Sequence, residues 1–491
     1  MSRALTLQPR PPVAPPARWR FPAPRRHRLG SGLTVLAHHL PGQHAATVLC
    51  HLGIPASAEP GGRDGIAAVM AASLGTAAGG ITARQFGQQA AAVGITWNTS
   101  AGWTGPVITL QLPARNIPAA LGLLRLALAE PALRPADAGS QIRLAAARLA
   151  AAAASPRTRA RQELPAAVYG SQCRAGRPAE GTRATIAQLT PDAITAFYDA
   201  QVRPARTTIV IAGDLTGLDA ITLAGQAFAT WADHRPASSD SAQPGPLPAR
   251  PPSAVVIDQP GAVQTQLLLA APVPGRGQPG WDALHTAAHI LGAPATGHLD
   301  TQLRQQAGTS YGLRASLTEL VPGTGLLLIA GAVDGPATGA ALTAITRILT
   351  APCHHGFSPA EHTTARQAIT RTAPLTCETP AEIAATTASL AACGLPAGYP
   401  SLLLDDITAL TTTTLNRAYH THLSHNQPAI IAVGDAATLT APLRELTAPS
   451  RTRQLTAAPR ASAAGPGHRH QPRETGAAAD DSKKDTRTEV L

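Results

Sequence analysis

The stretch Thr207-Thr-Ile-Val-Ile-Ala-Gly-Asp214 predicts a buried strand that ends in a turn. β-Branched and aliphatic residues favour strands, and Gly followed by Asp favours the turn. A helical pattern at residues 189–198 precedes this strand. The same order returns in the second half, where residues 407–422 lead into Ala429-Ile-Ile-Ala-Val433 and the turn Gly434-Asp435. The two Gly-Asp turns lie 221 positions apart, so the sequence predicts a duplicated α+β fold.

The 491-residue chain divides into two halves around a segment dense in Pro, Ser and Gly. This composition predicts a linker at residues 234–252, between a first domain at 27–233 and a second at 253–450. The flanking residues 1–26 and 451–491 are rich in Pro, Ala and Gly. We therefore expect a disordered basic arm before the first domain and a disordered tail after the second.

The distribution of charge argues against a nucleic-acid partner. The formal net charge is +11, but residues 1–28 hold seven Arg and no acid, and residues 451–491 hold eight basic and five acidic residues. The remaining body has 25 basic and 24 acidic residues and is almost neutral. Proteins that track phosphates need a concentrated basic face.

The Cys residues and the apolar pattern favour a cytoplasmic protein without a membrane partner. The five Cys are widely spaced and form no C-x-x-C pair, which favours a reducing compartment. Residues 1–26 contain no apolar segment typical of a secretory signal, and no apolar run reaches the roughly 18 residues that a membrane span needs. The excess of Arg over Lys indicates a GC-rich, actinobacterial type of genome.

The segment Gly65-Ile-Ala-Ala-Val-Met-Ala-Ala-Ser-Leu74 predicts a short helix after a strand-like run at 45–52 and a Gly-rich turn at 55–64. This layout resembles the start of the M16 family of metallopeptidases, the pitrilysin and mitochondrial-processing-peptidase type. Further segments of this chain resemble the family in the same order: Leu29-Gly-Ser-Gly-Leu-Thr-Val-Leu36, Gly75-Thr-Ala-Ala-Gly-Gly80, Gly181-Thr-Arg-Ala-Thr-Ile-Ala-Gln-Leu-Thr190, Ala196-Phe-Tyr198, Ile290-Leu-Gly-Ala293 and Leu303-Arg-Gln-Gln-Ala-Gly-Thr-Ser-Tyr-Gly312. Over residues 27–446 the chain is identified as an M16 member of the M16B type. The resemblance implies an antiparallel sheet with helices on one face in each half, and halves that close like a clamshell over a peptide.

In that family the first helix carries the zinc motif H-x-x-E-H, whose two His bind the metal while the Glu activates water. The resemblance places the two His on Ala68 and Ala72 and the Glu on Ala71. A third ligand, a Glu, belongs to a later helix, but residues 138–162 contain no Asp or Glu. Methyl groups cannot bind a metal. The resemblance therefore implies that this chain binds no zinc and is no enzyme on its own.

Arg304 and Tyr311 are the candidate functional residues. In split members of the family, an Arg and a Tyr at this spacing donate hydrogen bonds to substrate and to the oxyanion in the partner's site. The resemblance thus implies a non-catalytic subunit of a heterodimeric zinc peptidase. Its partner would keep H-x-x-E-H and the zinc, and its substrate would be a peptide such as a precursor or leader peptide. The alternative is a scaffold or peptide-binding protein that works without a peptidase.

Other candidate sites have simpler interpretations. The spacing of His285 with His289, the group His420, His422 and His425, and the pair His354-His355 permit metal binding, but surface or capping roles fit these residues better. The segment Gly75 to Gly80 fits either a substrate loop or a helix stop, and the stop is favoured.

Overall fold

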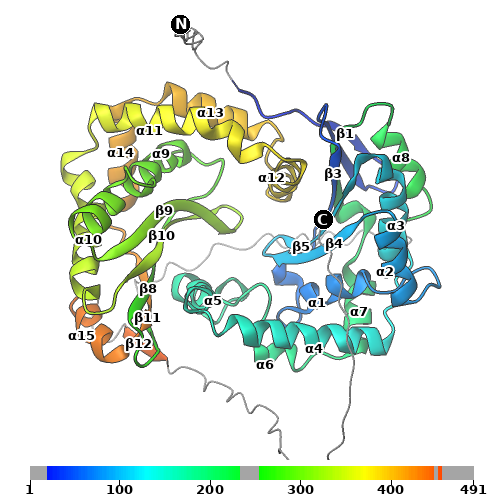
Figure 1. Cartoon of the computed structure of the whole chain (residues 1–491), viewed down its shortest axis with the longest axis horizontal. Coiled ribbons are helices and arrows are strands. Elements are labelled where there is room, and N and C mark those ends of the chain that lie inside the picture. Colours follow the sequence, from blue (N-terminus) through cyan, green and yellow to red (C-terminus); the bar gives the residue numbers. More distant parts are fainter. Residues whose placement is uncertain (1–18, 233–253, 447–451, 456–491) are drawn as a thin grey trace, which may run out of the picture. The chain divides into compact units, whose positions relative to one another are not determined.

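The computed structural model describes residues 19–232, 254–446 and 452–455, and holds two six-stranded sheets (Figure 1). The first sheet has the order β1-β2-β6-β3-β5-β4 and the second the order β12-β7-β11-β8-β10-β9. The predicted linker at 234–252 lies outside the described residues, as do residues 1–18 of the predicted arm and most of the predicted tail.

The first half contains the strands β1 (Arg25–Arg28), β2 (Thr34–His39), β3 (Ala45–Leu52), β4 (Thr96–Gly102), β5 (Gly105–Pro113) and β6 (Thr207–Gly213). Its helices are α1 (Ile66–Leu74), α2 (Ala83–Ala92), α3 (Ile117–Ala129), α4 (Pro135–Ala152), α5 (Pro156–Tyr169), α6 (Arg183–Ile186), α7 (Pro191–Gln201) and α8 (Ala220–Ala227). Short 3-10 turns are η1 (Ala56–Ala58), η2 (Ala114–Asn116), η3 (Arg174–Gly176) and η4 (Pro204–Arg206).

The second half contains the strands β7 (Ala254–Asp258), β8 (Gln264–Pro274), β9 (Ser310–Val321), β10 (Thr324–Asp334), β11 (Ala429–Gly434) and β12 (Thr452–Leu455). Its helices are α9 (Trp281–Gly292), the π-helix η5 (Asp300–Gln306), α10 (Thr338–His355), α11 (Pro359–Thr372), the 3-10 helix η6 (Ala373–Cys377), α12 (Pro380–Ala392), α13 (Tyr399–Ala409), α14 (Thr412–Leu423) and α15 (Ala436–Leu446). No described helix has both the length and the apolar character needed to cross a bilayer.

The two Gly-Asp turns make equivalent hydrogen bonds in the two sheets, which confirms the predicted duplication. Asp214 follows β6 and accepts a hydrogen bond from the N–H of Gly42, at 3.0 Å. Asp435 follows β11 and accepts one from the N–H of Gly261, also at 3.0 Å. Each carboxylate thereby ties its turn to the loop between two strands, β2 and β3 or β7 and β8, that lie on either side of the strand before the Asp. Hydrogen bonds from the hydroxyl and N–H of Thr216, and from the N–H of Gly42, hold the pKa of Asp214 at about 2, below its usual value.

The central strands are buried on both faces, which explains their unbroken apolar runs. Along β6, Ile209 and Ile211 join the core shared with the helices of the first half, while Val210 and Ala212 face the opposite side. That opposite face is covered by α12 of the second half, which packs on β3 and β6 (Figure 1). In exchange, α5 of the first half covers the second sheet at β11, β8 and β7. One face of each sheet is thus covered by a helix from the other half.

The α+β class with two related sheet-and-helix halves is confirmed. The sheets differ in detail from the antiparallel pattern that the resemblance implies, because β2 pairs with β6, and β7 with β11 and β12, in parallel. Helices also lie on both faces of each sheet. The domain boundaries stay predictions, although the described sheets already begin at Arg25 and extend to Leu455. The clamshell closure stays a prediction too.

Candidate functional site

Helix α1 carries the positions that the resemblance assigns to zinc chemistry. Ala68 and Ala72 are half-buried and lie one turn apart on the same face of the helix, while Ala71 is fully buried. The helix ends at Leu74 with Gly75 as its C-cap, which confirms the interpretation of Gly75 as a helix stop. A Cβ on Gly75 would approach the Trp97 indole to 2.4 Å, so close packing also requires glycine there.

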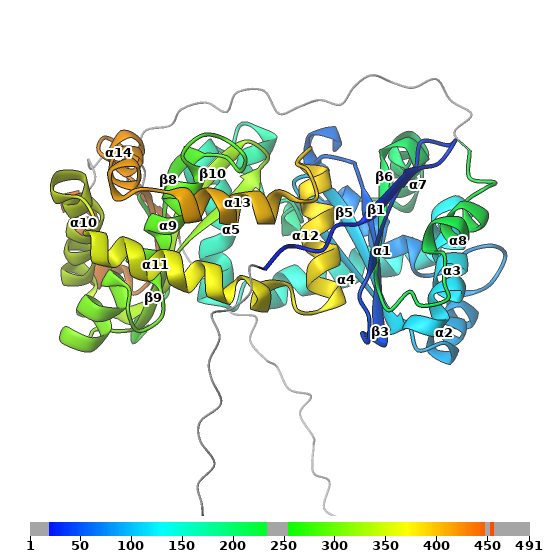
Figure 2. The ribbon, with the colours of Figure 1, turned by 90° about the horizontal axis from the view of Figure 1, so that it is seen from above.

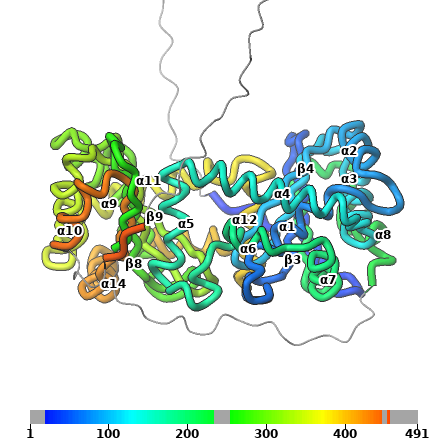
Figure 3. The backbone as a smooth tube through the Cα atoms, turned by 90° about the horizontal axis from the view of Figure 1, so that it is seen from below, coloured from blue at the N-terminus to red at the C-terminus, as the bar shows by residue number. Residues whose placement is uncertain are grey.

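Helix α4 packs against α1 and contains most of the window in which the third zinc ligand was sought (Figure 3). The two helices are therefore neighbours, as a shared metal site would require. Their facing residues are Ala and other apolar types, with no carboxylate on α4 after Asp137. Among the described residues, no three His, Cys, Asp or Glu side chains lie close enough together to hold a metal ion. The residues present at this site do not fit zinc.

We predict that the purified chain holds no stoichiometric zinc, because Ala68, Ala71 and Ala72 offer no ligand atom. Elemental analysis after dialysis against metal-free buffer should give far less than one zinc per chain. A matched preparation of a relative with an intact H-x-x-E-H helix serves as the positive control. One tightly held zinc per chain would show that the site lies elsewhere.

A buried ion network anchors the N-terminus of α1. Glu59 accepts hydrogen bonds from the backbone N–H groups of Gly65 and Ala67, and its side chain is 1% exposed. Arg174 of η3 donates to Glu59 through Nε and NH2, at 3.0 and 2.5 Å, and Nε lies 3.2 Å from Asp64. Asp64 also accepts from Arg177 at 2.6 Å. A carboxylate at a helix N-terminus is favourable for the helix dipole. The network therefore fixes α1 against the loop that follows α5.

The Glu59 carboxyl is held between opposing effects. Burial is the largest of these and raises the pKa of Glu59 above its usual value, although the Arg174 guanidinium and the N–H groups of Ala67 and Gly65 act to lower it. The guanidinium groups of Arg174 and Arg177 pair with the carboxylates of Glu59 and Asp64, so positive and negative charges are equal in number in this network.

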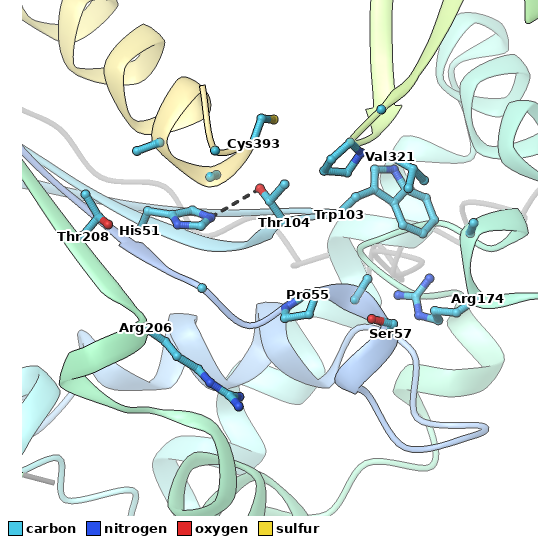
Figure 4. A pocket seen from close by; sticks show the side chains of 18 residues that line it. His51, Pro55, Ser57, Trp103, Thr104, Arg174, Arg206, Thr208, Val321 and Cys393 are labelled. Atoms are coloured by element: carbon cyan, nitrogen blue, oxygen red, sulfur yellow. Dashed lines mark hydrogen bonds between the residues drawn. The ribbon is translucent and has the colours of Figure 1, made fainter. Parts of the chain in front are cut away.

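A cavity of about 640 Å³ lies between the two halves, beside this network (Figure 4). From the first half, its walls are the end of β3, η1, the turn between β4 and β5, and Arg174. From the second half, they are the turn between β9 and β10 and the C-terminal end of α12, including Cys393. Its size is within the range of small-ligand sites.

The polar side of the cavity is formed by His51, Thr104, Thr208 and Ser57 (Figure 4). His51 Nε2 lies 3.3 Å from the Thr104 hydroxyl. The neighbouring Trp103 ring takes the Arg174 guanidinium on its face, 5.2 Å from the ring centroid. Arg174 and Arg206 also line the cavity, and no carboxylate occurs among its described walls, so it suits groups with full or partial negative charge, such as a peptide carbonyl, better than a cation.

Buried histidines make stability depend on pH, and two of them, His38 and His51, lie in the first sheet. Burial lowers the pKa of His51 and of His38 on β2 to about 4 each. The unfolded chain, with His pKa values near 6.5, then binds more protons between about pH 6.5 and 4. We predict that the free energy of unfolding is highest above pH 6.5 and falls by a few kcal/mol in total as the pH drops to about 4. Urea denaturation at pH 7 and 5 measures this change.

The matched variants for that experiment are His38→Asn and His51→Asn, which remove the titrating groups. Each should unfold more easily at pH 7 and lose less stability between pH 7 and 5 than the wild-type chain. An unchanged pH slope in both variants would contradict the assignment.

The structure places Arg304 and Tyr311 on the surface of the second half. Arg304 lies on η5, with its side chain 53% exposed and NH1 3.4 Å from Asp300 Oδ2. Tyr311 is the second residue of β9 and is 84% exposed. The N–H of Thr309 donates to the carbonyl of Leu303 at 2.9 Å and so joins the two segments. Neither residue lines the cavity, and no described contact brings them to α1.

The histidine groups are consistent with structural roles. His420 and His422 lie in the last turn of α14, where a histidine side chain can interact favourably with the negative end of the helix dipole. His354 and His355 are exposed at the end of α10. Burial lowers the pKa of His285 to about 4 and also lowers that of His289, so both are mainly neutral. None belongs to a metal cluster among the described residues.

Sequence reasoning missed the cavity and the ion network. A usable signal existed in His51, a lone imidazole inside the apolar strand run at 45–52, and in Trp103 at a tight turn. Arg174 gave no local signal, because its partners Glu59 and Asp64 are 115 and 110 positions away.

Comparisons with known proteins agree with this architecture. Residues 188–369 match the family model described as the Peptidase M16 inactive domain. Curated protein sequences give no significant match. Among solved structures, the chain is similar to the peptidase M16 inactive domain from Pseudomonas fluorescens, with a TM-score of 0.74 and 20% identity over 84% of this chain and 98% of that chain. It is also similar to a protease from Helicobacter pylori, with a TM-score of 0.75 and 16% identity over 84% of this chain and 100% of that one. At these identities the likeness shows a shared fold.

Proposed function

We propose that this chain is a non-catalytic M16-type subunit that pairs with a catalytic zinc peptidase of the same type. The observation that carries the proposal is the α1 helix, which lies against α4 as a ligand helix would but presents Ala68, Ala71 and Ala72. The match of residues 188–369 to the inactive-domain model supports it, as does the fold shared with an M16 inactive domain. The zinc would belong to the partner, which keeps H-x-x-E-H.

In the assembled peptidase, Arg304 and Tyr311 would serve the partner's active site. A guanidinium and a phenol both donate hydrogen bonds, and donors aimed at developing negative charge stabilise a transition state. Their exposure supports this role, because residues that act on another subunit's site must be accessible before assembly. The substrate would be a peptide, such as a precursor or leader peptide, in the cytoplasm, with no nucleic acid or membrane involved.

The second candidate is a scaffold or peptide-binding protein without a peptidase partner. The cavity between the halves favours it, because this cavity is lined without Arg304 or Tyr311 and lacks a carboxylate among its described walls. A peptide segment could occupy it whether or not a catalytic subunit exists.

Reconstitution decides between the two candidates. The chain is co-expressed with an H-x-x-E-H member encoded in the same genome, purified through a tag on one chain, and tested on a quenched fluorescent peptide library. We expect a one-to-one complex that cleaves peptide, while each chain alone is inactive. Failure to co-purify, together with full activity of the zinc chain alone, would favour the scaffold.

A further inference from the structure

Residues 19–24, called the N-terminal strap below, run from β1 of the first sheet to helices of the second half (Figure 2). Arg20 NH1 donates to Asp405 Oδ2 on α13, at 2.7 Å. The backbone N–H of Phe21 donates to the hydroxyl of Ser401 on the same helix, at 2.9 Å. Both contacts join residues at least 380 positions apart in the chain.

The Phe21 ring fills an apolar slot between the halves. It is 4% exposed and belongs to a cluster with Leu36 and Leu49 of the first sheet and with Ile383, Ala384 and Ala388 of α12. His38 of β2 meets the Phe21 ring edge-on, with centroids 5.9 Å apart. The same imidazole lies 2.9 Å from the Thr387 hydroxyl of α12 through Nε2. The slot is therefore closed by one face of the first sheet and by α12, while Ser401 of α13 binds the Phe21 amide.

Arg20 and Phe21 of the strap meet different features of the receiving surface, and Trp19 packs, partly buried, against the Phe21 cluster. Trp19 packs edge-on against Phe21 at 6.3 Å between centroids, Arg20 meets a carboxylate, and Phe21 supplies both a buried ring and a buried amide donor. A buried N–H needs a partner, and Ser401, itself 9% exposed, provides it. The buried ring and the cation distinguish this contact from general apolar packing, whereas the amide donor is a backbone group and selects no side chain.

We propose that the groove between β2, α12 and α13 is a binding site for a peptide segment of the pattern aromatic–Arg–aromatic. In this chain, Trp19-Arg20-Phe21 fills it in cis and holds α12 and α13 against the first sheet. Because the far end of α12 forms a wall of the cavity beside Cys393, a filled groove also positions that wall. The proposal does not depend on a peptidase partner.

Hydrogen exchange of the full-length chain tests whether the strap holds the helices. The Phe21→Ala variant removes a buried ring, so amide exchange in α12 and α13 should speed up by about tenfold or more, while α10 at the far side keeps its wild-type rate. Arg20→Asp should give a smaller increase, up to about fivefold, because the pair with Asp405 is partly exposed. The double variant Arg20→Asp/Asp405→Arg restores a pair of opposite charges and should return amide exchange toward the wild-type rate. Asp406→Ala, which removes the neighbouring carboxylate on α13, is the matched control and should leave exchange at the wild-type rate.

Binding in trans tests the site itself. A fluorescent peptide of residues 15–24 should bind full-length Phe21→Ala, whose groove lacks its own ring, and bind the wild-type chain at least tenfold more weakly. The same peptide with Ala in place of Phe21 should not bind, whereas an Ala23→Ser peptide should bind like the parent.

Two results would overturn the proposal. One is exchange in α12 and α13 that stays at the wild-type rate in Phe21→Ala. The other is a peptide that binds wild type and variant equally or fails to bind the variant. If Phe21→Ala does not fold, lack of rescue by Asp405→Arg in the Arg20→Asp chain overturns it instead. Peptide cleavage is not measured in any of these experiments, so their outcome is independent of the proposed function.

Discussion

Arg304→Ala, in the chain paired with its catalytic partner, is expected to lower kcat by roughly one to three orders of magnitude. The reason is that a donor to an oxyanion acts on charge that exists only in the transition state. KM should rise as well if Arg304 also binds the substrate backbone. Tyr311→Phe, which removes one hydroxyl and keeps the ring, should act in the same direction. Steady-state kinetics on a defined peptide measures both effects.

The structure makes Arg304→Ala a clean substitution. Asp300, the buried carboxylate beside Arg304, keeps its hydrogen bonds from Arg314 at 3.1 Å and from the N–H of Ala295 at 2.8 Å. Burial raises the pKa of Asp300, but these bonds outweigh burial and hold the pKa below its usual value. Co-purification with the partner should therefore survive. Arg347→Ala, an exposed Arg on α10, is the matched control. Wild-type rates in both the Arg304 and Tyr311 variants would reduce this pair to ordinary surface residues.

Glu59→Ala is expected to lower the free energy of unfolding by about 3–5 kcal/mol. The substitution leaves the Arg174 guanidinium, 10% exposed, with Asp64 and the carbonyls of Arg177 and Ala179 but without its closest carboxylate. It also removes the acceptor from the N–H groups of Gly65 and Ala67. Loss of one partner of a buried pair costs far more than loss of an exposed pair, because the remaining charge stays out of water. Urea denaturation followed by circular dichroism at pH 7 measures the change.

Glu130→Gln is the matched control, because Glu130 pairs with Arg125 at 2.5 Å but is 52% exposed. That substitution should cost less than about 1 kcal/mol. An equally small cost for Glu59→Ala would mean that water or side-chain movement compensates the network.

Much of the fold could be predicted because its signals are local. The apolar run before Asp214 and its counterpart before Asp435 mark the same strand in each half, and their carboxylates cap equivalent turns. The positions of Ala68 and Ala72 on one helix face follow from spacing alone. Such features depend on residues a few positions apart.

The remaining features depend on distant residues. The apolar face of α5, formed by Leu164, Ala167 and Val168, predicts burial but not burial against β11 of the other half. The side chains of His51 and Arg174 meet around one cavity only after both sheets have formed. The parallel pairing of β2 with β6 likewise joins strands separated by most of the first half. Pattern alone does not choose among such distant partners.

The exchange of α5 and α12 has a consequence for synthesis on the ribosome. The apolar face of α5 is complete at Tyr169, and it packs on β7, β8 and β11. The last of these strands, β11, begins only at Ala429, 260 positions later. At about 5–20 residues per second, that face waits on the order of tens of seconds for its last partner. The second face of the first sheet waits in the same way for α12. Neither half can finish burying its core while the other is missing. Early termination, or cleavage between the halves before they have packed, therefore leaves fragments with exposed apolar surface that tend to aggregate. Chaperones must accordingly protect the chain until both halves have been made.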